Sequence, residues 1–229
     1  MKSYDFEGTD PLLEWTGKSE GSHSGTIVLK TDNRAVSFTS LIGSGDIFSV
    51  WTTPQTADVF FRLYLDKIPC SGACFGHSLG YPGAHGWDVC DAYSTVYPAA
   101  EEWLVCMVAA FPANQHIMIE DFPTSNPSSC PAENAAGDAY YGDIVVKSQA
   151  SSPVEFTGCL TLEGLFDEEI KPACPCDPQQ SLTVFIDCVE QAVQVLRNDN
   201  IITDVEKDEL NQMARAATSC GIPGECSAL

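Results

Sequence analysis

A serine motif is the most specific catalytic pattern in the chain. The run Gly76-His77-Ser78-Leu79-Gly80 matches Gly-x-Ser-x-Gly. In hydrolases this motif places a nucleophilic serine on a strained turn between a strand and a helix. His85 or His116 would then serve as the base, and Asp88 or Asp91 would orient it. The preceding residues make no convincing strand, and the Tyr-Pro-Gly that follows does not suit a long helix. We therefore treat serine hydrolysis as a minor alternative.

Two further patterns resemble metal sites. Cys70-x3-Cys74-x2-His77, taken with His85, offers donor types that zinc accepts. Disulfide formation is the better use of those thiols in an oxidising compartment. The stretch 199–206 resembles a calcium loop but lacks the glycine at the sixth position. Its carboxylates are better explained as solvated charges that stabilise the start of a helix.

Paired carboxylates form a third kind of pattern, because glycosidases need two carboxyl groups about 5–9 Å apart. Neighbouring residues of a strand face opposite sides of the sheet, so Glu120 and Asp121 do not share a site. No Glu-x-Asp run occurs in any candidate strand. We interpret all the pairs as solvated surface charge: Glu101-Glu102, Glu120-Asp121 and Asp167-Glu168-Glu169.

Composition excludes several classes of protein. The 229 residues include 32 Asp and Glu against 11 Lys and Arg, which gives a formal net charge of −21. Such a surface repels the phosphates of nucleic acids and of anionic membranes. No segment approaches the roughly 18 consecutive apolar residues of a membrane-spanning helix. Apolar residues make up 44% of the chain, which is enough for a real core in one mid-sized domain with a small appendage.

Cysteine usage indicates an oxidising compartment. The 11 cysteines are scattered along the chain without the Cys-x2-Cys pairs of zinc ribbons. An odd number leaves at least one thiol free or paired with another chain. Residues 1–7 contain no apolar signal-peptide core, so we interpret the chain as a secreted protein after signal removal. A cytosolic protein with reduced thiols is the alternative.

The first 165 residues have the texture of a β protein. Short apolar or alternating runs are separated by Gly, Pro, Asn and Ser. The run 58–65 is apolar on nearly both faces, which is typical of a central strand between two layers. Strands without intervening helices favour an antiparallel sandwich. The candidate strands are Gly25–Thr31, Ala35–Ser40, Asp46–Thr52, Val59–Leu65, Trp103–Ala110, His116–Asp121, Gly142–Lys147 and Val154–Leu162.

Two segments between these strands are long enough to be functional loops. Pro69–Ala100 contains three cysteines and most of the loop aromatics, and Pro123–Asp138 surrounds Cys130. Disulfides in the first segment would hold it as a shaped surface. Trp15, Trp51 and Trp103 instead fall on or beside strands, and we expect them in the core.

The chain changes texture after Pro172. Apolar residues recur at helical spacing in Ser181–Leu196, and Asn198-Asp199-Asn200 interrupts the pattern. A capping box at Thr203–Glu206 opens a second helix through about Thr218, and Gly221 would end it. The sequence thus predicts a β-sandwich over residues 1–171 and a helical hairpin over 172–229.

A disulfide is expected to staple this hairpin. Counting outward from the turn near residue 200, Cys174 or Cys176 lies opposite Cys220 or Cys226. A hairpin of this size buries too little apolar surface to be stable alone, so such a staple would stabilise it.

An ordered series of segments resembles the concanavalin A-like lectin/glucanase superfamily, in particular secreted bacterial laminin G-like domains. The order of the segments carries the resemblance, which covers residues 4–160. It implies a jelly roll of two antiparallel sheets whose first and last strands are adjacent. The segments are Tyr4–Gly8, Trp15, Phe60–Leu65, Glu102–Cys106, His116–Asp121 and Tyr140–Val146.

The resemblance also bears on catalysis and on calcium. Glucanases of the superfamily carry Glu-x-Asp-x-x-Glu on one strand, and this chain has no such run, so we expect no enzyme. Many members hold a structural calcium ion near the first and last strands. Carried over to this chain, the ligands are Asp5 or Glu7 with Asp143, and Asp138 is an outside candidate. Plain surface charge is the alternative for the two N-terminal carboxylates.

These observations together predict a secreted or cell-surface, non-catalytic module of lectin type that binds a carbohydrate or a surface polymer. Aromatic rings would pack against sugar faces while polar groups fix their orientation. The expected ligand-binding residues are Tyr81, His85, Trp87, Asp88, Asp91, Tyr93 and Tyr97; packing around the disulfides is their alternative role. The alternative function is a structural subunit of an extracellular layer or filament, assembled through the odd cysteine or the hairpin.

Overall fold

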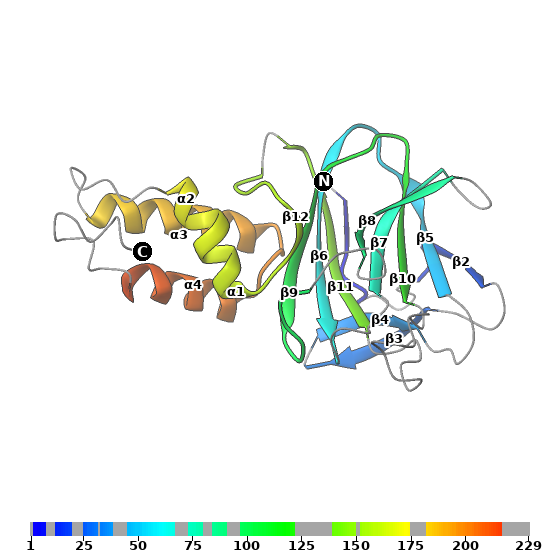
Figure 1. Cartoon of the computed structure of the whole chain (residues 1–229), viewed down its shortest axis with the longest axis horizontal. Helices are drawn as coiled ribbons and strands as arrows, with labels where there is room; N and C mark the ends of the chain where they lie inside the picture. Colours follow the sequence, from blue (N-terminus) through cyan, green and yellow to red (C-terminus); the bar gives the residue numbers. More distant parts are fainter. Residues whose placement is uncertain are drawn as a thin grey trace, which may run out of the picture.

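A computed structural model describes residues 2–7, 12–19, 25–31, 33–38, 45–66, 73–79, 84–90, 97–121, 139–149, 152–174 and 182–216. Two antiparallel sheets pack face to face, and helices lie on one side of this sandwich (Figure 1). The predicted fold class, a mainly β sandwich with a C-terminal helical hairpin, is confirmed. None of the described helices is long and apolar enough to span a membrane.

The larger sheet has seven strands in the order β12-β9-β6-β11-β4-β3, and β1 pairs with β11. The first strand of the chain therefore lies beside β11, as the resemblance implied. The strands are β1 (Lys2–Tyr4), β3 (Gly25–Lys30), β4 (Asn33–Phe38), β6 (Ala57–Leu65), β9 (Trp103–Phe111), β11 (Ala139–Lys147) and β12 (Thr157–Leu160).

The smaller sheet has five strands in the order β2-β5-β10-β7-β8. Its strands are β2 (Trp15–Ser19), β5 (Gly45–Thr52), β7 (Ala73–Ser78), β8 (His85–Cys90) and β10 (His116–Asp121). The expected long loop Pro69–Ala100 is wrong in this respect, because much of it forms the β7–β8 pair. The serine motif begins inside β7, and the next described strand, β8, returns antiparallel to it. The strand–turn–helix frame of a hydrolase is therefore not formed here.

The main core lies between the two sheets. Phe61 of β6 stacks on Phe75 of β7 with ring centroids 4.0 Å apart, and Tyr141 is fully buried beside them. All nine residues of β6 are buried. Strand alternation explains this pattern, because residues 59, 61, 63 and 65 face the core between the sheets while Phe60 and Arg62 face the opposite side. The prediction of a central two-faced strand is thus confirmed.

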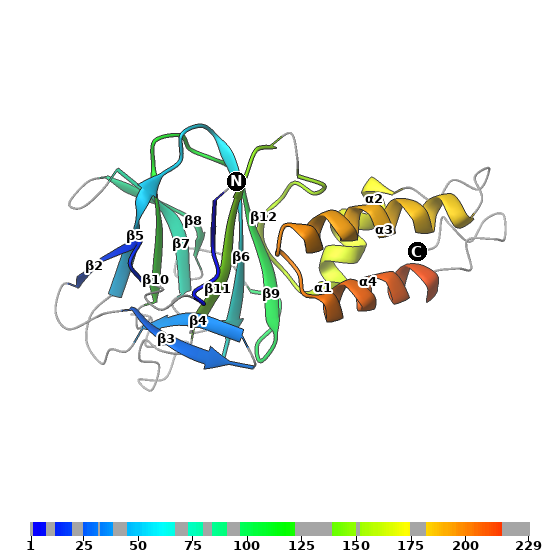
Figure 2. The same ribbon diagram turned by 180° about the vertical axis from the view of Figure 1, so that it is seen from behind.

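Helical segments cover part of the outer face of the seven-stranded sheet (Figures 1 and 2). They are α1 (Leu162–Gly164), η2 (Leu165–Ile170), α2 (Lys171–Ala173), α3 (Leu182–Asn198) and α4 (Asp204–Ala216). Strand residues Phe60, Val105, Met107 and Val145 join helix residues such as Phe185 and Leu210 in a second apolar cluster.

Two details of the helical part bear on the predictions. The capping box forms, because Thr203 N donates to Glu206 Oε2 at 2.8 Å and Glu206 N donates to Thr203 Oγ1 at 3.2 Å. The helices of residues 162–173 were not expected, and they replace the end of the strand predicted for Val154–Leu162. Their Leu165, Phe166 and Ile170 pack in the same cluster as the hairpin. The domain boundary at 171/172 stays a prediction.

Three disulfides form among the described cysteines: Cys74–Cys90, Cys106–Cys159 and Cys174–Cys188. The expected pairing of Cys174 with Cys220 or Cys226 is wrong, because one turn of α3 presents Cys188 to it. The other expected partners, Cys176, Cys220 and Cys226, lie outside the described residues, as do Cys70 and Cys130.

Burial overturns one interpretation of charge. Glu101 and Glu102 are exposed as expected, but Glu120 is 7% exposed and Asp121 is fully buried. The two belong to β10, the middle strand of the five-stranded sheet, so a paired strand flanks them on each side.

Candidate functional site

The outer face of the five-stranded sheet, which points away from the core, carries an uninterrupted cross-strand row. In register from β2 to β8 the row reads Thr16, Phe48, Met118, Gly76 and Trp87. Facing residues on neighbouring strands lie about 4.5–5.5 Å apart. The row therefore forms one continuous strip. Phe48 and Met118 in its middle are 5% and 1% exposed, and the strip ends in the half-buried indole ring of Trp87. The described helices lie on the other side of the sandwich (Figure 2).

Trp87 is held in place by a glycine on the neighbouring strand. A Cβ atom at Gly76 would stand 3.0 Å from both Cα and Cε3 of Trp87, so only glycine permits this approach. The indole is half-buried, and the exposed His85 lies beside it with ring centroids 5.7 Å apart and planes at 62°. Two of the predicted ligand residues are thus brought together on one open edge.

A second row adds polar groups next to this strip. His116 of β10 faces Ser78 of β7, and Ser78 faces His85 of β8. Nδ1 of His116 lies 2.6 Å from the carbonyl oxygen of Ser49. A carbonyl only accepts, so Nδ1 donates and Nε2 of the neutral ring remains an acceptor. The sequence offered no signal that grouped His116 with His85.

A buried carboxylate follows on the third row. Glu120 of β10 faces Cys74 of β7, which faces Cys90 of β8. The Cys74–Cys90 disulfide therefore joins directly opposite residues and fixes β8, with its Trp87, to the sheet. Glu120 was expected to be solvated surface charge, but it is buried. Its register with Cys74 places it on this outer face of the sheet.

Asp88, another predicted ligand residue, has a different partner. His77 Nδ1 donates to Asp88 Oδ2 at 3.0 Å. The imidazole packs over Gly86 and against Phe111. Burial raises the pKa of Asp88, although the hydrogen bond and the charge of His77 oppose the shift. The His77–Asp88 hydrogen bond therefore joins β7 to β8, the strand that carries Trp87.

Of the remaining predicted ligand residues, Tyr97 does not join this face. Tyr97 is 4% exposed and its hydroxyl donates to the carbonyl oxygen of Ala73 at 2.7 Å, so it is a core residue rather than a ligand-facing one. Tyr81, Asp91 and Tyr93 lie outside the described residues.

Trp103 was expected in the core and lies elsewhere. It is half-buried on the outer face of the seven-stranded sheet, where Nε1 donates to Thr31 Oγ1 at 2.6 Å. Its ring contacts Tyr64 edge to face and approaches Gly142, where an added Cβ would stand 3.4 Å from the indole. Each outer face therefore carries one tryptophan packed against a glycine of another strand.

The predicted calcium ligands lie near one another at the β1–β11 pair. Burial raises the pKa of Asp143; Asn33 and Arg62 oppose the shift, and the negative charges of Asp5 and Glu7 add to it. Asp5 Oδ1 accepts from the backbone N–H of Glu7 at 3.1 Å, and Glu7 faces Arg34.

These carboxylates do not converge into a coordinating set. Within the described ranges, no group of three or more His, Cys, Asp or Glu side chains is placed to hold a metal ion. Asp138 lies outside those ranges. The calcium ion stays a prediction.

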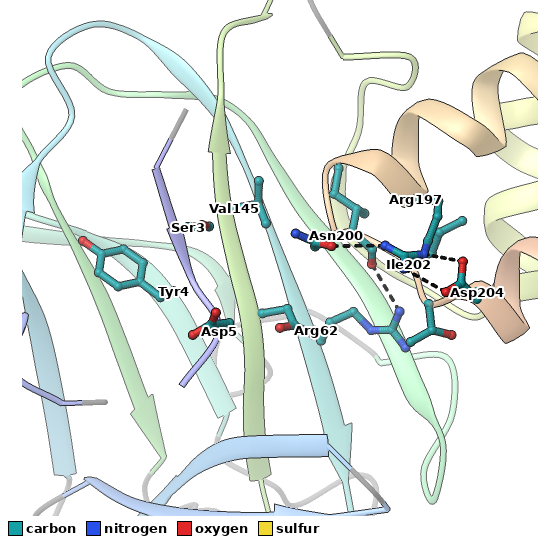
Figure 3. Close-up of a pocket in the computed structure, with 12 residues that line it drawn as sticks. Ser3, Tyr4, Asp5, Arg62, Val145, Arg197, Asn200, Ile202 and Asp204 are labelled. Carbon is teal, nitrogen blue, oxygen red and sulfur yellow. Dashed lines mark hydrogen bonds and ion pairs between the residues drawn. The ribbon is translucent and has the colours of Figure 1, made fainter. Parts of the chain in front are cut away.

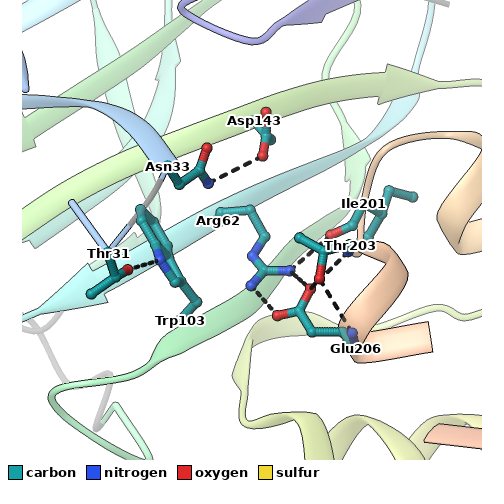
Figure 4. A network of polar contacts seen from close by, with 8 residues as sticks. All are labelled: Thr31, Asn33, Arg62, Trp103, Asp143, Ile201, Thr203 and Glu206. Carbon is teal, nitrogen blue, oxygen red and sulfur yellow. Dashed lines mark hydrogen bonds and ion pairs between the residues drawn. The ribbon is translucent and has the colours of Figure 1, made fainter. Parts of the chain in front are cut away.

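A cleft of about 360 Å³ opens where the sandwich meets the α3–α4 turn (Figure 3). Asp5 and Asp143 line it from the sheet side, and Asn200 and Thr203 line it from the turn. Arg62, only 3% exposed, reaches from β6 to the hairpin. Its guanidinium donates to both carboxylate oxygens of Glu206, and Nη1 also donates to the carbonyl oxygen of Ile201 (Figure 4).

This chain is similar to known proteins in structure but not detectably in sequence. The chain matches no protein-family profile and no curated protein sequence. A CBM22-1 xylan-binding domain from Paenibacillus barcinonensis aligns at 12% identity and a TM-score of 0.38, covering 64% of this chain and 92% of that one. A xylan-binding module CBM15 aligns at 12% identity and 0.41, covering 65% and 95%.

A protein of unknown function with a galectin-like fold from Bacillus subtilis aligns at 10% identity and a TM-score of 0.41, covering 65% of this chain and 95% of that one. At such values function does not transfer from these structures to this chain. The two-sheet sandwich agrees with the broad lectin-like fold expected from the sequence, and the laminin G-like assignment stays a prediction.

Proposed function

We propose that the sandwich is a non-catalytic carbohydrate-binding module whose ligand lies on the outer face of the five-stranded sheet. The observation that carries the proposal is the Trp87–His85 pair, held at the end of a continuous cross-strand strip by Gly76. An indole face packs well against the C–H face of a pyranose ring. Sugar hydroxyls need donors and acceptors nearby, and the exposed His85 and the half-buried His116 supply them in the adjacent row.

An extended polymer suits this face better than a single sugar. The middle of the strip is buried, and its accessible aromatic and polar groups, Trp87 and His85, lie on β8. A polymer that runs along this edge would contact both of them, since residues two apart on a strand are separated by about 7 Å. A carbohydrate or surface polymer therefore remains the proposed partner, and the module works outside the cell. Three disulfides among the described cysteines support an oxidising compartment.

Binding without catalysis is proposed because hydrolysis needs two cooperating carboxyl groups. The residue in register with Glu120 on β5 is Asp46, so this pair of positions is the one at which catalysis should be tested. A Glu120→Gln variant decides between the two roles. If the wild-type chain releases reducing sugar from a bound polymer and this variant does not, the module is an enzyme.

The decisive experiment compares two tryptophan variants. Affinity electrophoresis against xylan, mannan and mixed-linkage β-glucan should show retardation of the wild-type chain. Trp87→Ala should weaken binding about tenfold or more, since it removes the stacking surface. Trp103→Ala is the matched control, because this tryptophan also packs against a glycine but on the other sheet.

Two outcomes would end the proposal. One is the absence of retardation on every neutral and acidic polymer tested. The other is equal loss of binding in both variants, which would indicate general destabilisation rather than a contact with the ligand. Thermal unfolding of each variant checks that it is folded.

Calcium is proposed as a structural ion near Asp5, Glu7 and Asp143. The ion would reduce the repulsion among these carboxylates, so chelation with EDTA should lower the melting temperature. An unchanged melting temperature would remove calcium from the description. Self-association through a cysteine outside the described residues also stays a prediction, and light scattering after size-exclusion tests it.

A further inference from the structure

Arg62, which lines the cleft at the junction, has a donor whose hydrogen-bonding capacity is not used. Nε of Arg62 is buried and has no acceptor among the described residues, although both Nη atoms are engaged. The side chain is 4% exposed. Leaving a buried, charged donor without a partner is costly, so an acceptor is expected next to it.

The other charges of the cleft are arranged unevenly. Arg197 is neutralised by Asp204 through contacts of 2.6 and 2.8 Å. Arg62 is neutralised by Glu206. Asp5 and Asp143 remain on the sheet side, and Asp143 accepts a single hydrogen bond of 3.4 Å, from Asn33. The cleft thus offers an unused cationic N–H together with carboxylates that can still accept.

This combination selects the chemistry of an occupant. An anion would satisfy Arg62 Nε but would meet the charges of Asp5, Asp143 and Asp204. A cation would suit the carboxylates but would leave Nε unsatisfied and lie near two arginines. A hydroxyl group accepts from Nε and donates to a carboxylate at the same time. A neutral, hydroxyl-bearing molecule answers both requirements, and bound water would do so until such a ligand displaces it.

We propose that the junction cleft is a binding site for a small polyhydroxy molecule, such as a monosaccharide or the end of a sugar chain, held between Arg62 and Asp143. A volume of about 360 Å³ lies within the range of small-molecule pockets. The lining comes from β1, β6 and β11 on one side and from the α3–α4 turn on the other (Figure 3). The helical hairpin therefore completes the site. This site lies away from the five-stranded sheet, so it can be tested independently of the function proposed above.

The test uses the full chain with D-xylose, D-glucose and myo-inositol as separate probes in isothermal titration and ligand-observed NMR. Wild type should bind at least one probe in the millimolar range. Asp143→Asn should weaken this binding about tenfold, because a neutral amide oxygen accepts a weaker hydrogen bond than a carboxylate does. Asparagine suits this position because the backbone φ is 29° there.

A second variant acts through shape. Ser3 is exposed on β1 and lines the cleft, so Ser3→Phe should fill it and abolish binding without disturbing the core. Asp167→Asn is the matched control, since it removes the same charge from an exposed helix residue and should leave binding unchanged. Melting temperatures show whether each variant is folded.

The results separate this site from the one on the five-stranded sheet. Monosaccharide binding that survives Trp87→Ala but not Ser3→Phe supports the cleft. Three results would overturn it: no probe binds the wild type, binding is unaffected by both cleft variants, or Trp87→Ala alone abolishes it. In the last case polymer binding at Trp87 would still stand.

Discussion

The two outer faces of the sandwich differ in the residues that strand alternation points outward from the core. On the seven-stranded sheet, Phe60, Val105 and Met107 point outward and disappear under the helices. On the five-stranded sheet, the outward positions include Phe48 and Met118, which are also buried, but the β8 edge carries the half-buried Trp87 and the exposed His85. An apolar face needs a cover to be stable in water, whereas an aromatic and polar face retains groups for a ligand.

The covered face also contains two cations that the helical part neutralises. Arg62 pairs with Glu206 and Lys147 pairs with Asp199, and both cationic side chains are about 95% buried. A buried charge without a partner is costly, so these pairs fix where the hairpin docks. The comparison indicates that the hairpin contributes to the stability of the sandwich, while the opposite face presents Trp87 and His85 at its β8 edge.

The largest effect should come from truncating the covered face. Phe60→Ala removes a ring that is 1% exposed between sheet and helices and should cost about 3–5 kcal/mol of unfolding free energy. Trp87→Ala, on a half-buried residue of the other face, should cost clearly less. Urea unfolding of both variants measures the difference, and equal costs would contradict the division of roles.

Removing one disulfide from each side should cost less and should separate stability from binding. Cys174 and Cys188 close a loop with a sequence separation of 14, and Cys74 and Cys90 close one of 16. Such loops predict about 3 kcal/mol each. Paired serine variants should therefore lose similar stability by urea unfolding, but only the Cys74/Cys90 variant should also weaken polymer binding. Equal weakening by both would show that the faces are not independent.

A smaller effect is expected from the Arg62–Glu206 pair. Glu206→Ala leaves Arg62 buried without its carboxylate and should cost about 2–3 kcal/mol. The double variant Arg62→Met/Glu206→Leu should recover most of this loss, because it replaces the charges with apolar contacts. Glu190→Ala is the control, since its pair with Arg215 is exposed and worth little. A double variant as unstable as the single one would mean that the pair stabilises the junction by more than charge balance.

Much of the sandwich could be predicted because local sequence and burial agree. Strand β6 has apolar residues on both of its faces, and all of its residues are buried. The capping box at Thr203 directly marks the start of α4. The β7–β8 pair was missed because its sequence contains Gly76 and Gly86. Those glycines suit a strand only because Trp87 and His77 pack against them from the neighbouring strand.

The start of the helices at residues 162–173 did have a sequence signal. Thr161 caps α1, with its Oγ1 accepting from the backbone N–H of Gly164 at 3.0 Å, and a threonine before an acidic first turn is typical of a helix start. The apolar run before it favoured a strand instead. By contrast, the burial of Glu120 depends on which strands flank β10, and a sequence read alone does not contain that order.

Some residues of the candidate site could be predicted from local sequence, and others could not because they depend on the order of the strands. His85 and Trp87 were found because aromatic and polar types cluster between cysteines, and the disulfide does hold their strand in place. His116 and Glu120 reach the same face from a segment about 30 residues away in sequence, through sheet order alone. Trp103 was misplaced although alternation was available, since Leu104, Cys106 and Val108 take the core-facing positions of its strand.

The smallest effect concerns pH, and here the two faces should differ in sign. Burial of Glu206 opposes its charged form, but the hydrogen bonds and charge of Arg62 outweigh burial and lower its pKa from the ordinary 4.5. Its contribution to stability is therefore complete above pH 4.5 and is lost as the pH falls through the lower folded-state value. The pKa of Asp88 is raised by burial from the ordinary 3.8, so protonation favours the folded chain and its contribution increases as the pH falls toward 3.8. Melting temperatures between pH 3 and 7, taken as wild type minus Glu206→Gln and wild type minus Asp88→Asn, should move in opposite directions on acidification. Two differences that move together would show that one of these carboxyl groups does not have the partner that the fold gives it.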